Sequence, residues 1–167
     1  WQISILGGYG ETELYEIFRG NIEEAYSLKQ GTEWITTIKA YDGSYQIHNG
    51  FANETITADV PKKDAVKRII HTMPQILIGA LGQPATGATA RGQVMVGDSY
   101  KLIQGLTNNH AFIAGETMYV LGEDEVLHGD AFVLDSDLNF TTPKRRDTYV
   151  ELDTIFCPEI RIAGIAE

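Results

Sequence analysis

Apolar and polar residues alternate along the first third of the chain, and an alternation with a period of two is the pattern of β-strands. Gly7-Gly8, the polar residues 29–32 and Asp42-Gly43 interrupt this alternation as turns do. The runs expected to form strands are residues 1–6, 14–19, 22–28, 33–41, 45–49 and 54–58. Short strands at this spacing predict a small β-barrel or β-sandwich.

The third and fourth of these runs carry the clearest turn signals of the chain. The residue pair Asp42-Gly43 favours a tight turn, because Gly accepts a positive φ and Asp tolerates one. Alternation places Trp34 in line with Thr36 and Ile38, on the side that we expect to face a core. The large residues expected in the core are Trp34, Ile38, Ile17 or Phe18, Ile69 and Leu106.

The apolar spacing becomes helical after residue 59. Asp59 is the expected N-cap of a first helix, Pro61 lies in its first turn and Pro74 ends it. Its apolar stripe consists of Val66, Ile69, Ile70 and Met73. A second helix is expected at residues 99–108, capped by Asp98 or Ser99, and its buried stripe consists of Leu102, Ile103 and Leu106.

The remaining segments are shorter. Gly, Ala and Thr dominate residues 79–92, which predicts a long loop, and a strand is expected at 93–96. A hairpin should follow, with strands at 111–113 and 117–121 around a turn at Ala114-Gly115. Beyond residue 126 the pattern predicts strands at 131–134, 148–152 and 160–165, with an exposed turn at 143–146.

This order of elements predicts a β-rich α+β protein, in which a small β-barrel domain is interrupted by an inserted α+β lobe with two helices. The expected limits are residues 1–58 for the first part of the barrel, 59–125 for the lobe and 126–167 for the return strands. Both ends of the chain alternate like strands, and we expect the chain to be a piece of a longer protein.

The net charge of −10 argues against a surface built to bind phosphate groups. Between Lys101 and Lys144 the chain contains no Lys or Arg. The acids in this acidic stretch are Glu116, Glu123, Asp124, Glu125, Asp130, Asp135 and Asp137. They form either a solvated face or a surface that repels polyanions. No apolar run is long enough for a bilayer span, so we expect no direct membrane insertion.

The sequence predicts no catalytic, cofactor-binding or metal-binding residues. The histidines, His48, His71, His110 and His128, stand singly without ligand spacing. The run 135–139 begins like a calcium loop, but Phe140 and Arg146 replace the Gly and Glu that such a loop needs. Residues 82–87 lack the Gly-Lys-Ser/Thr of a phosphate loop. The single Cys157 lies in an apolar setting and is expected to pack as a small core residue.

Several short motifs resemble one family in their order and spacing. They are Gly8-Tyr9, Ile17-Phe18-x-Gly20-x-Ile22, Trp34-x-Thr36-x-Ile38-x-Ala40-x-Asp42-Gly43, the helix at 64–70, Ala90-Arg91-Gly92-x-Val94, Gly97-Asp98-Ser99 and Phe112-Ile113-Ala114-Gly115-x-Thr117-Met118-Tyr119-Val120-Leu121. Together they resemble the baseplate hub proteins of contractile-tailed phages, in the Mu-like tail protein and late control protein D group. The Gly-Leu-Ile-Gly-x-Pro type of run expected near the end is replaced here by residues 140–146.

The resemblance implies small β-barrels with an α+β insertion and assembly into a homotrimer. Two similar barrels per subunit would make a pseudo-sixfold ring that joins the sixfold tail tube to the threefold central spike for DNA ejection. It implies a structural protein without enzymatic activity, located in the baseplate of the virion tail and assembled in the host cytoplasm. Its partners would be the tail tube protein and the central spike protein, and it would not bind nucleic acid stably.

Two other functions are open. A tail-associated cell-wall or polysaccharide hydrolase would need two carboxylates about 5 to 10 Å apart in a groove, and the sequence nominates no such pair. A carbohydrate-binding module would use Trp1, Trp34 and the tyrosines.

Overall fold

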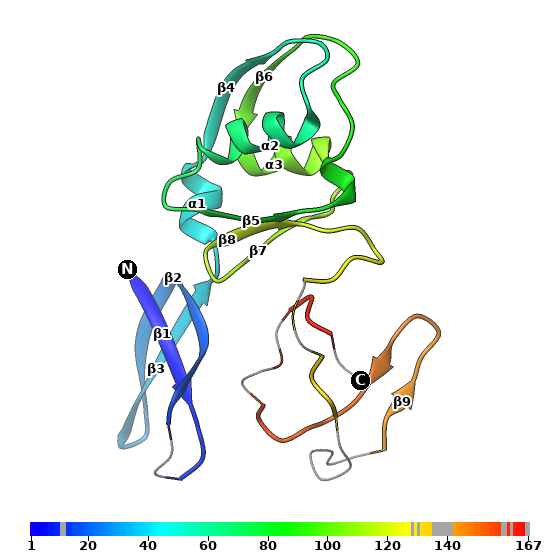
Figure 1. Cartoon of the computed structure of the whole chain (residues 1–167). Coiled ribbons are helices and arrows are strands. Elements are labelled where there is room, and N and C mark those ends of the chain that lie inside the picture. Colours follow the sequence, from blue (N-terminus) through cyan, green and yellow to red (C-terminus); the bar gives the residue numbers. More distant parts are fainter. Residues whose placement is uncertain are drawn as a thin grey trace. The chain divides into compact units, whose positions relative to one another are not determined.

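The computed structural model describes residues 1–10, 13–127, 129, 131–134, 142–157, 160 and 162–165. Its strands are β1 (Gln2–Gly7), β2 (Tyr15–Gln30), β3 (Glu33–Tyr41), β4 (Phe51–Ile56), β5 (Leu77–Leu81), β6 (Gln93–Asp98), β7 (Ala111–Ala114), β8 (Thr117–Val120), β9 (Lys144–Arg145) and β10 (Val150–Glu151). Its helices are α1 (Ser44–Asn49), α2 (Lys62–Ile70), α3 (Ser99–Leu106) and the 3-10 helix η1 (Gln83–Ala85). Figure 1 shows these elements along the chain.

The chain divides into two compact units, each of which combines two segments. The first unit contains residues 1–5 and 18–125, and the second contains residues 6–17 and 126–167. The three-part division at residues 58 and 125 stays a prediction. None of the helices in the described residues is long and apolar enough to cross a membrane.

The α+β class is confirmed, because the structure is β-rich with three α-helices and several sheets. The predicted β-barrel is not found. The described strands form separate sheets, and none of these sheets closes on itself. Their strand orders are β1-β2-β3, β4-β6, β5-β8-β7 and β10-β9. Strand β4, expected in the barrel, pairs instead with β6, the strand that leads into α3.

The strand predicted at 45–49 is wrong, because these residues belong to helix α1. Its side chains satisfy the backbone of the same turn: Asn49 Nδ2 donates to the Tyr45 carbonyl at 2.8 Å, and His48 Nδ1 lies 2.8 Å from the Ser44 carbonyl oxygen. Gln46 becomes fully buried by this arrangement. Burial of one helix face has outweighed the alternation of a six-residue segment, which is too short for periodicity to decide.

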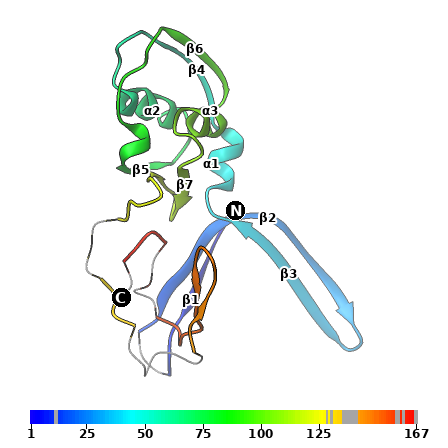
Figure 2. The same cartoon turned by 90° about the vertical axis from the view of Figure 1, so that its right-hand side faces the viewer.

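The core of the first unit lies around α2 and α3, and we call these helices, the β4-β6 pair and the β5-β8-β7 sheet together the lobe. Figure 1 shows these helices between the β4-β6 pair and the β5-β8-β7 sheet, and Figure 2 shows the same order from the side. The largest fully buried apolar side chains are Ile56, Val66, Ile69, Ile70, Ile103, Met118 and Val120. The helical stripes predicted from the sequence are therefore the faces that pack.

The N-terminal cap of α2 differs from the prediction, whereas the N-terminal cap of α3 agrees with it. Asp59 makes no cap: it has a φ of 61°, and Pro61 is the N-cap residue of α2. For α3, Asp98 is the N-cap as expected, and its Oδ1 accepts from the Lys101 N–H at 3.2 Å. The predicted loop at 79–92 is shorter than expected, because Leu77–Leu81 forms β5 and η1 follows.

In the second unit the described strands are short. The turn predicted at 143–146 contains β9, which pairs with β10 inside the predicted strand 148–152. In the segment 131–134 the Phe132 N–H donates to the Ile165 carbonyl at 2.9 Å. The described residues of 160–165 form no strand. Cys157 is half-buried, and its Sγ lies 3.3 Å from the Ile155 carbonyl oxygen.

We expect Ile69→Ala to lower the free energy of unfolding by about 2 to 5 kcal/mol, because it removes a fully buried side chain. Leu106→Ala should cost less, since Leu106 lies half-buried at the margin of the same core. Val94→Ala is the control: Val94 is 70% exposed, and the expected loss is about 0.5 kcal/mol or less. Denaturant unfolding followed by circular dichroism measures all three. Equal losses for Ile69→Ala and Val94→Ala would contradict the assignment of the buried helix face.

Candidate assembly surface

The hairpin formed by β2 and β3 is fixed at its base by one carboxylate. Asp42, directly after β3, accepts from the Gly115 N–H at 2.6 Å and from the Glu116 N–H at 3.1 Å. Gly115 and Glu116 form the turn between β7 and β8, and both have positive φ values, 58° and 59°. Two neighbouring N–H groups with left-handed backbone make a concave donor pair that suits a carboxylate. Asp42 therefore joins the hairpin to the lobe.

Gly43 continues this junction at a φ of 71°, which confirms the predicted positive φ. Its turn leads from β3 into α1 rather than into another strand. A Cβ at this position would lie 2.8 Å from Ile113 Cδ1, so Gly is required by contact as well as by φ.

Beyond its base, the hairpin is not covered by other described residues of the first unit. Every residue from 23 to 36 is exposed, and we call this segment the arm. The predicted connection at residues 29–32 is confirmed: Gln30 pairs with Glu33 across a tip that contains Gly31 at a φ of 62°. Figure 2 shows the far half of the hairpin as a two-stranded ribbon that runs on alone. An isolated two-stranded hairpin is marginally stable in water at best.

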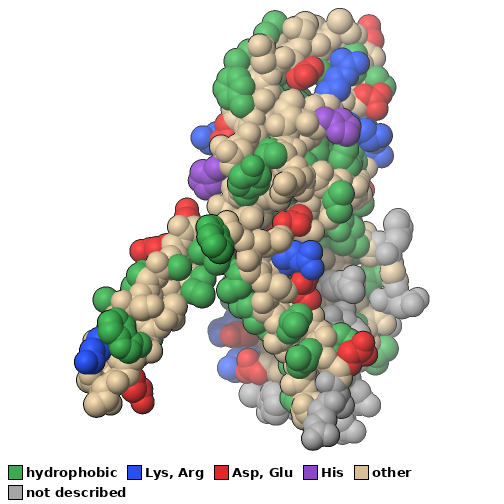
Figure 3. All heavy atoms as spheres, turned by 90° about the vertical axis from the view of Figure 1, so that its left-hand side faces the viewer, with side chains coloured by type: hydrophobic (Ala, Val, Ile, Leu, Met, Phe, Trp, Pro, Cys, Tyr) green, Lys and Arg blue, Asp and Glu red, His purple; other side chains and the backbone are tan. Residues whose placement is uncertain are grey.

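Apolar side chains lie on both faces of the hairpin. The register places Leu28 opposite Ile35 on one face, and Ala25 opposite Ile38 on the other. The exposed large hydrophobic residues are Tyr26, Leu28 and Ile35 on the first face and Trp34 and Ile38 on the second. Figure 3 shows hydrophobic side chains along this projecting ribbon and charged ones near its tip.

The predicted core positions in this part of the chain are therefore wrong. Trp34 is 70% exposed, and Ile17 and Ile38 are about half exposed; only Phe18 is partly buried. Alternation assigned Trp34 to a core because one-sided burial is the usual reason for alternation, but the hairpin has apolar residues on both sides. Exposed apolar side chains on both faces are typical of a surface that another molecule or another segment covers.

The sheet that contains the hairpin also has an edge strand with unpaired backbone groups. In the order β1-β2-β3, strand β3 is an edge strand along its whole length. Near its base the hairpin carries an irregularity between Ile22 and Glu24. There the Glu24 carboxylate pairs with the Lys39 ammonium, and the hydrogen bond and the charge of Glu24 raise the pKa of Lys39. Both side chains are about half exposed, so the pair adds little stability.

The acidic stretch is described only in its first part, because Asp130, Asp135 and Asp137 lie outside the described residues. Glu123 and Asp124 are exposed, as solvated acids are expected to be. Glu125 is different: its carboxylate accepts from the Gly122 N–H at 2.7 Å and from the Gln83 N–H at 2.8 Å. These hydrogen bonds, first that of Gly122 and then that of Gln83, lower the pKa of Glu125. Through these hydrogen bonds Glu125 connects η1 to the residues that follow β8.

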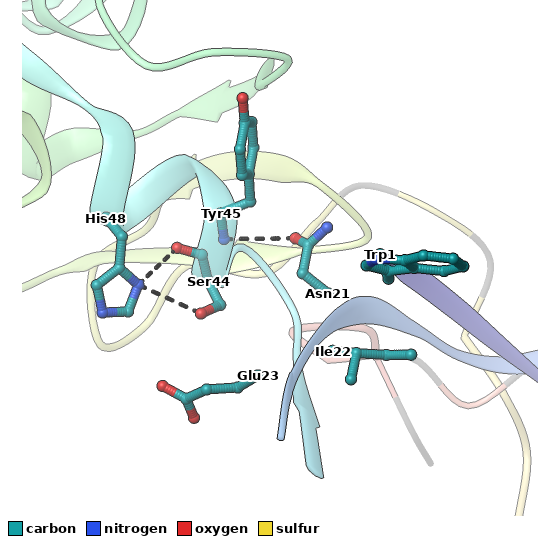
Figure 4. A pocket seen from close by; sticks show the side chains of 7 residues that line it. All are labelled: Trp1, Asn21, Ile22, Glu23, Ser44, Tyr45 and His48. Carbon is teal, nitrogen blue, oxygen red and sulfur yellow. Dashed lines mark hydrogen bonds between the residues drawn. The ribbon is translucent and has the colours of Figure 1, made fainter. Parts of the chain in front are cut away.

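Two hollows of the first unit contain candidate chemistry. One contains two acidic residues and a histidine, and its lining residues are Gln83, Pro84, Asn108, His110, Gly122, Glu123 and Asp124. The other lies at the base of the hairpin, where Asn21 stands between Trp1 and Tyr45 (Figure 4). The Asn21 Oδ1 accepts from the Tyr45 N–H at 3.4 Å, which orients the amide.

The histidines are separated from one another in the described residues. His48 belongs to α1, His71 is the C-cap of α2, and His110 precedes β7. Across the described ranges no three His, Cys, Asp or Glu side chains come together as a metal site. The calcium-like run at 135–139 and His128 lie outside the described residues.

Sequence reasoning missed the two carboxylates that matter most for the structure, Asp42 and Glu125. Asp42 was assigned only a local turn role, yet its partners stand 73 and 74 residues further along the chain. The available signal was the Gly115-Glu116 turn, whose N–H groups need an acceptor. Nothing local distinguishes Glu125 from Glu123 and Asp124.

Gly43→Ala should destabilise the chain more than Gly87→Ala. Both positions have positive φ, 71° and 85°, and such strain costs about 1 to 3 kcal/mol. Only the Cβ at position 43 would also overlap a neighbour, Ile113, whereas nothing lies within 4 Å of a Cβ at position 87. Denaturant unfolding compares the variants, and equal losses would show that the contact with Ile113 does not matter.

Glu125→Gln should lower the melting temperature at neutral pH, while Glu123→Gln, at an exposed carboxylate, should not. The pKa of Glu125 is lowered by folding, so its stabilisation is complete above the pKa of the unfolded chain and is lost as the pH falls through the folded pKa. The difference between wild type and Glu125→Gln should therefore shrink as the pH falls from about 7 to about 3. A difference that stays constant with pH would contradict this role.

Comparison with known proteins assigns no family to the chain. No family model matches it, and no curated protein matches it either.

Proposed function

We propose that the chain is a structural component of a phage tail baseplate hub. In this proposal it forms a homotrimeric, pseudo-sixfold ring that joins the tail tube protein to the central spike protein and through which DNA leaves the virion. The proposal combines the motif resemblance with one structural observation, the arm, whose exposed residues carry apolar side chains on both faces. The chain acts by assembly and not by catalysis.

The arm supports assembly for a physical reason. A single contact surface on a protein can be satisfied by one partner, but a ribbon that is apolar on both faces needs cover on two sides. In a ring each subunit has two neighbours, and head-to-tail contacts of this kind close into rings. The base of the hairpin is held by Asp42, so the arm leaves the lobe from a defined point.

The charge of the chain supports passage of DNA without retention. Stable nucleic-acid binding requires Lys and Arg that neutralise phosphates, and each such contact adds a salt-dependent attraction. Glu123 and Asp124 expose negative charge in a stretch that lacks basic residues. We place this acidic stretch on the surface that faces the lumen of the ring.

One observation favours the alternative, a tail-associated cell-wall or polysaccharide hydrolase. Glu123 and Asp124 line the same hollow as His110, and paired carboxylates in a groove are what glycoside hydrolysis needs. This hollow is the place where such an enzyme would act on its substrate.

The solution mass of the full-length protein tests the proposal. Light scattering after gel filtration should give three times the mass of the single chain. Trp34→Glu and Leu28→Glu, one on each face of the hairpin, should both lower the mass to that of a monomer, because each places a charge in a contact. Val94→Glu is the control, because Val94 is as exposed as Trp34 but lies in β6, outside the arm.

A monomeric wild-type protein would contradict the hub proposal. Release of sugar from peptidoglycan or a polysaccharide, abolished by Glu123→Gln and Asp124→Asn, would support the hydrolase instead. Glu125 is left unchanged in this test because it has a structural role.

A further inference from the structure

Helix α1 ends on the dipeptide Asn49-Gly50, the one place in the sequence where Gly follows Asn. In such a pair the backbone nitrogen of the second residue is well placed to attack the side-chain amide of the first, because Gly has no Cβ to hinder the approach. Asn49 is exposed, so its side-chain amide is also accessible to water. The end of α1 therefore combines two groups that react with each other and the solvent that completes their reaction.

The packing of the lobe requires Gly at position 50. A Cβ there would lie 2.8 Å from Met73 Cγ and 3.2 Å from Ser99 Cβ. The Gly50 carbonyl accepts from the Ser99 N–H at 3.1 Å, which fixes the backbone beside these side chains. The φ of Gly50 is −82°, so contact and not backbone conformation excludes a larger residue. The reactive dipeptide is therefore a consequence of close packing at the start of β4.

The closed form of α1 protects Asn49. Its Nδ2 donates to the Tyr45 carbonyl at 2.8 Å, and this hydrogen bond holds the side-chain amide toward the preceding turn of the helix. Attack by the Gly50 nitrogen requires that the hydrogen bond break and that the last turn of the helix open. The rate of the reaction is therefore set by how often α1 opens.

Several features of α1 favour opening. The helix has six residues, which is too short for stability without tertiary packing, and its N-cap residue Gly43 supplies no side-chain hydrogen bond. Gln46 is fully buried, and neither its Oε1 nor its Nε2 has a hydrogen-bond partner among the described residues. A buried amide without partners is unfavourable, and opening lets it form hydrogen bonds with water.

We propose that Asn49-Gly50 is a site of spontaneous covalent modification that is gated by the opening of α1. In the open form the Gly50 nitrogen attacks Asn49 Cγ. A bond forms between these two atoms, the bond from Cγ to Nδ2 breaks, and ammonia leaves with the proton that the Gly50 nitrogen loses. Water then opens the five-membered succinimide ring at either carbonyl. The product at position 49 is aspartate, or isoaspartate, in which the main chain runs through the former side chain.

The products do not restore the closed helix end. The new carboxylate cannot donate to the Tyr45 carbonyl, and its charge lies at the negative end of the helix dipole. Isoaspartate also adds one methylene group to the main chain directly before Gly50, which has no room to move. Figure 1 shows α1 between the end of β3 and the start of β4. The reaction is therefore a one-way change in the segment that connects the hairpin to the lobe.

The inference goes beyond the hub proposal and does not depend on it. The hub proposal rests on the arm and is tested by the mass of the assembly. The modification needs only residues of one chain and is tested by the chemistry of one peptide. A monomeric protein that modifies Asn49, or a trimer that does not, would separate the two.

The experiment is incubation of the purified full chain at mildly alkaline pH, followed over time by trypsin digestion and mass spectrometry. Lys39 and Lys62 are consecutive cleavage sites, so a single peptide, residues 40–62, contains both Asn49 and Asn53. Exchange of –NH2 for –OH raises the mass, and fragment ions locate the change. Asn53 is the internal control, because it precedes Glu54 and lies in β4. A synthetic peptide of residues 45–53 gives the rate without the fold.

We expect modification of Asn49 to accumulate in the folded chain more slowly than in the synthetic peptide, while Asn53 stays unchanged. Gln46→Met keeps the length of the side chain and removes the unpaired amide. It should slow the reaction about 5- to 30-fold by favouring the closed helix. Exchange of the Ile47 N–H, which donates to the Gly43 carbonyl at 2.9 Å, measures the opening of α1 and should slow in the same ratio.

Ile69→Ala is the matched variant for global stability. It weakens the core of the lobe without changing α1, and it should leave the rate at Asn49 unchanged. Three outcomes would overturn the proposal. They are an unmodified Asn49 after the synthetic peptide has reacted completely, equal rates in the peptide and the folded chain, and acceleration by Ile69→Ala without an effect of Gln46→Met. The last outcome would place the reaction in the unfolded chain.

Discussion

The Asp42 carboxylate is the contact on which the arrangement of the first unit depends. Its two hydrogen bonds connect the end of β3 to the β7-β8 turn, and this turn belongs to the sheet that covers α2 and α3. A charged acceptor with two backbone donors is among the stronger hydrogen-bonding arrangements in proteins. Two further hydrogen bonds support it, from Gln2 Nε2 to Glu116 Oε1 at 2.6 Å and from the Tyr45 N–H to Asn21 Oδ1 at 3.4 Å.

Burial is distributed very unevenly over the first unit. The lobe buries its apolar residues between two helices and two sheets, as an ordinary small domain does. The arm buries none of its side chains, although it has the same kinds of residue. The stability of the lobe is therefore a property of the single chain, whereas in the proposed assembly the order of the arm would be coupled to the subunit that covers it. Such coupling would make the apparent stability of the arm dependent on protein concentration.

The parts of the fold that could be predicted are those in which one side of an element is buried. The stripe of Val66, Ile69 and Ile70 shows a helical period because α2 has one buried face, and the hairpin around Gly115 was found for the same reason. Helix α1 was missed since six residues hold too few periods. Trp34 was misassigned because alternation reveals which residues share a face and not whether that face is covered. The hollow lined by Trp1, Tyr45 and Glu116 could not be predicted either, because only tertiary contacts bring these residues together.

The hairpin also has a mechanical consequence. Its two strands pair from Asn21–Tyr41 at the base to Gln30–Glu33 at the tip, with one shift of register between Ile22 and Glu24, and antiparallel ladder bonds run perpendicular to the strands. Tension applied between the ends of the two strands at the base peels these bonds one after another, beginning beside Asp42. A load that pulls one strand lengthwise past the other acts on all of them at once. The same ribbon is therefore weak when unzipped and strong in shear, and the direction of an applied force decides whether the arm yields or transmits that force to the lobe.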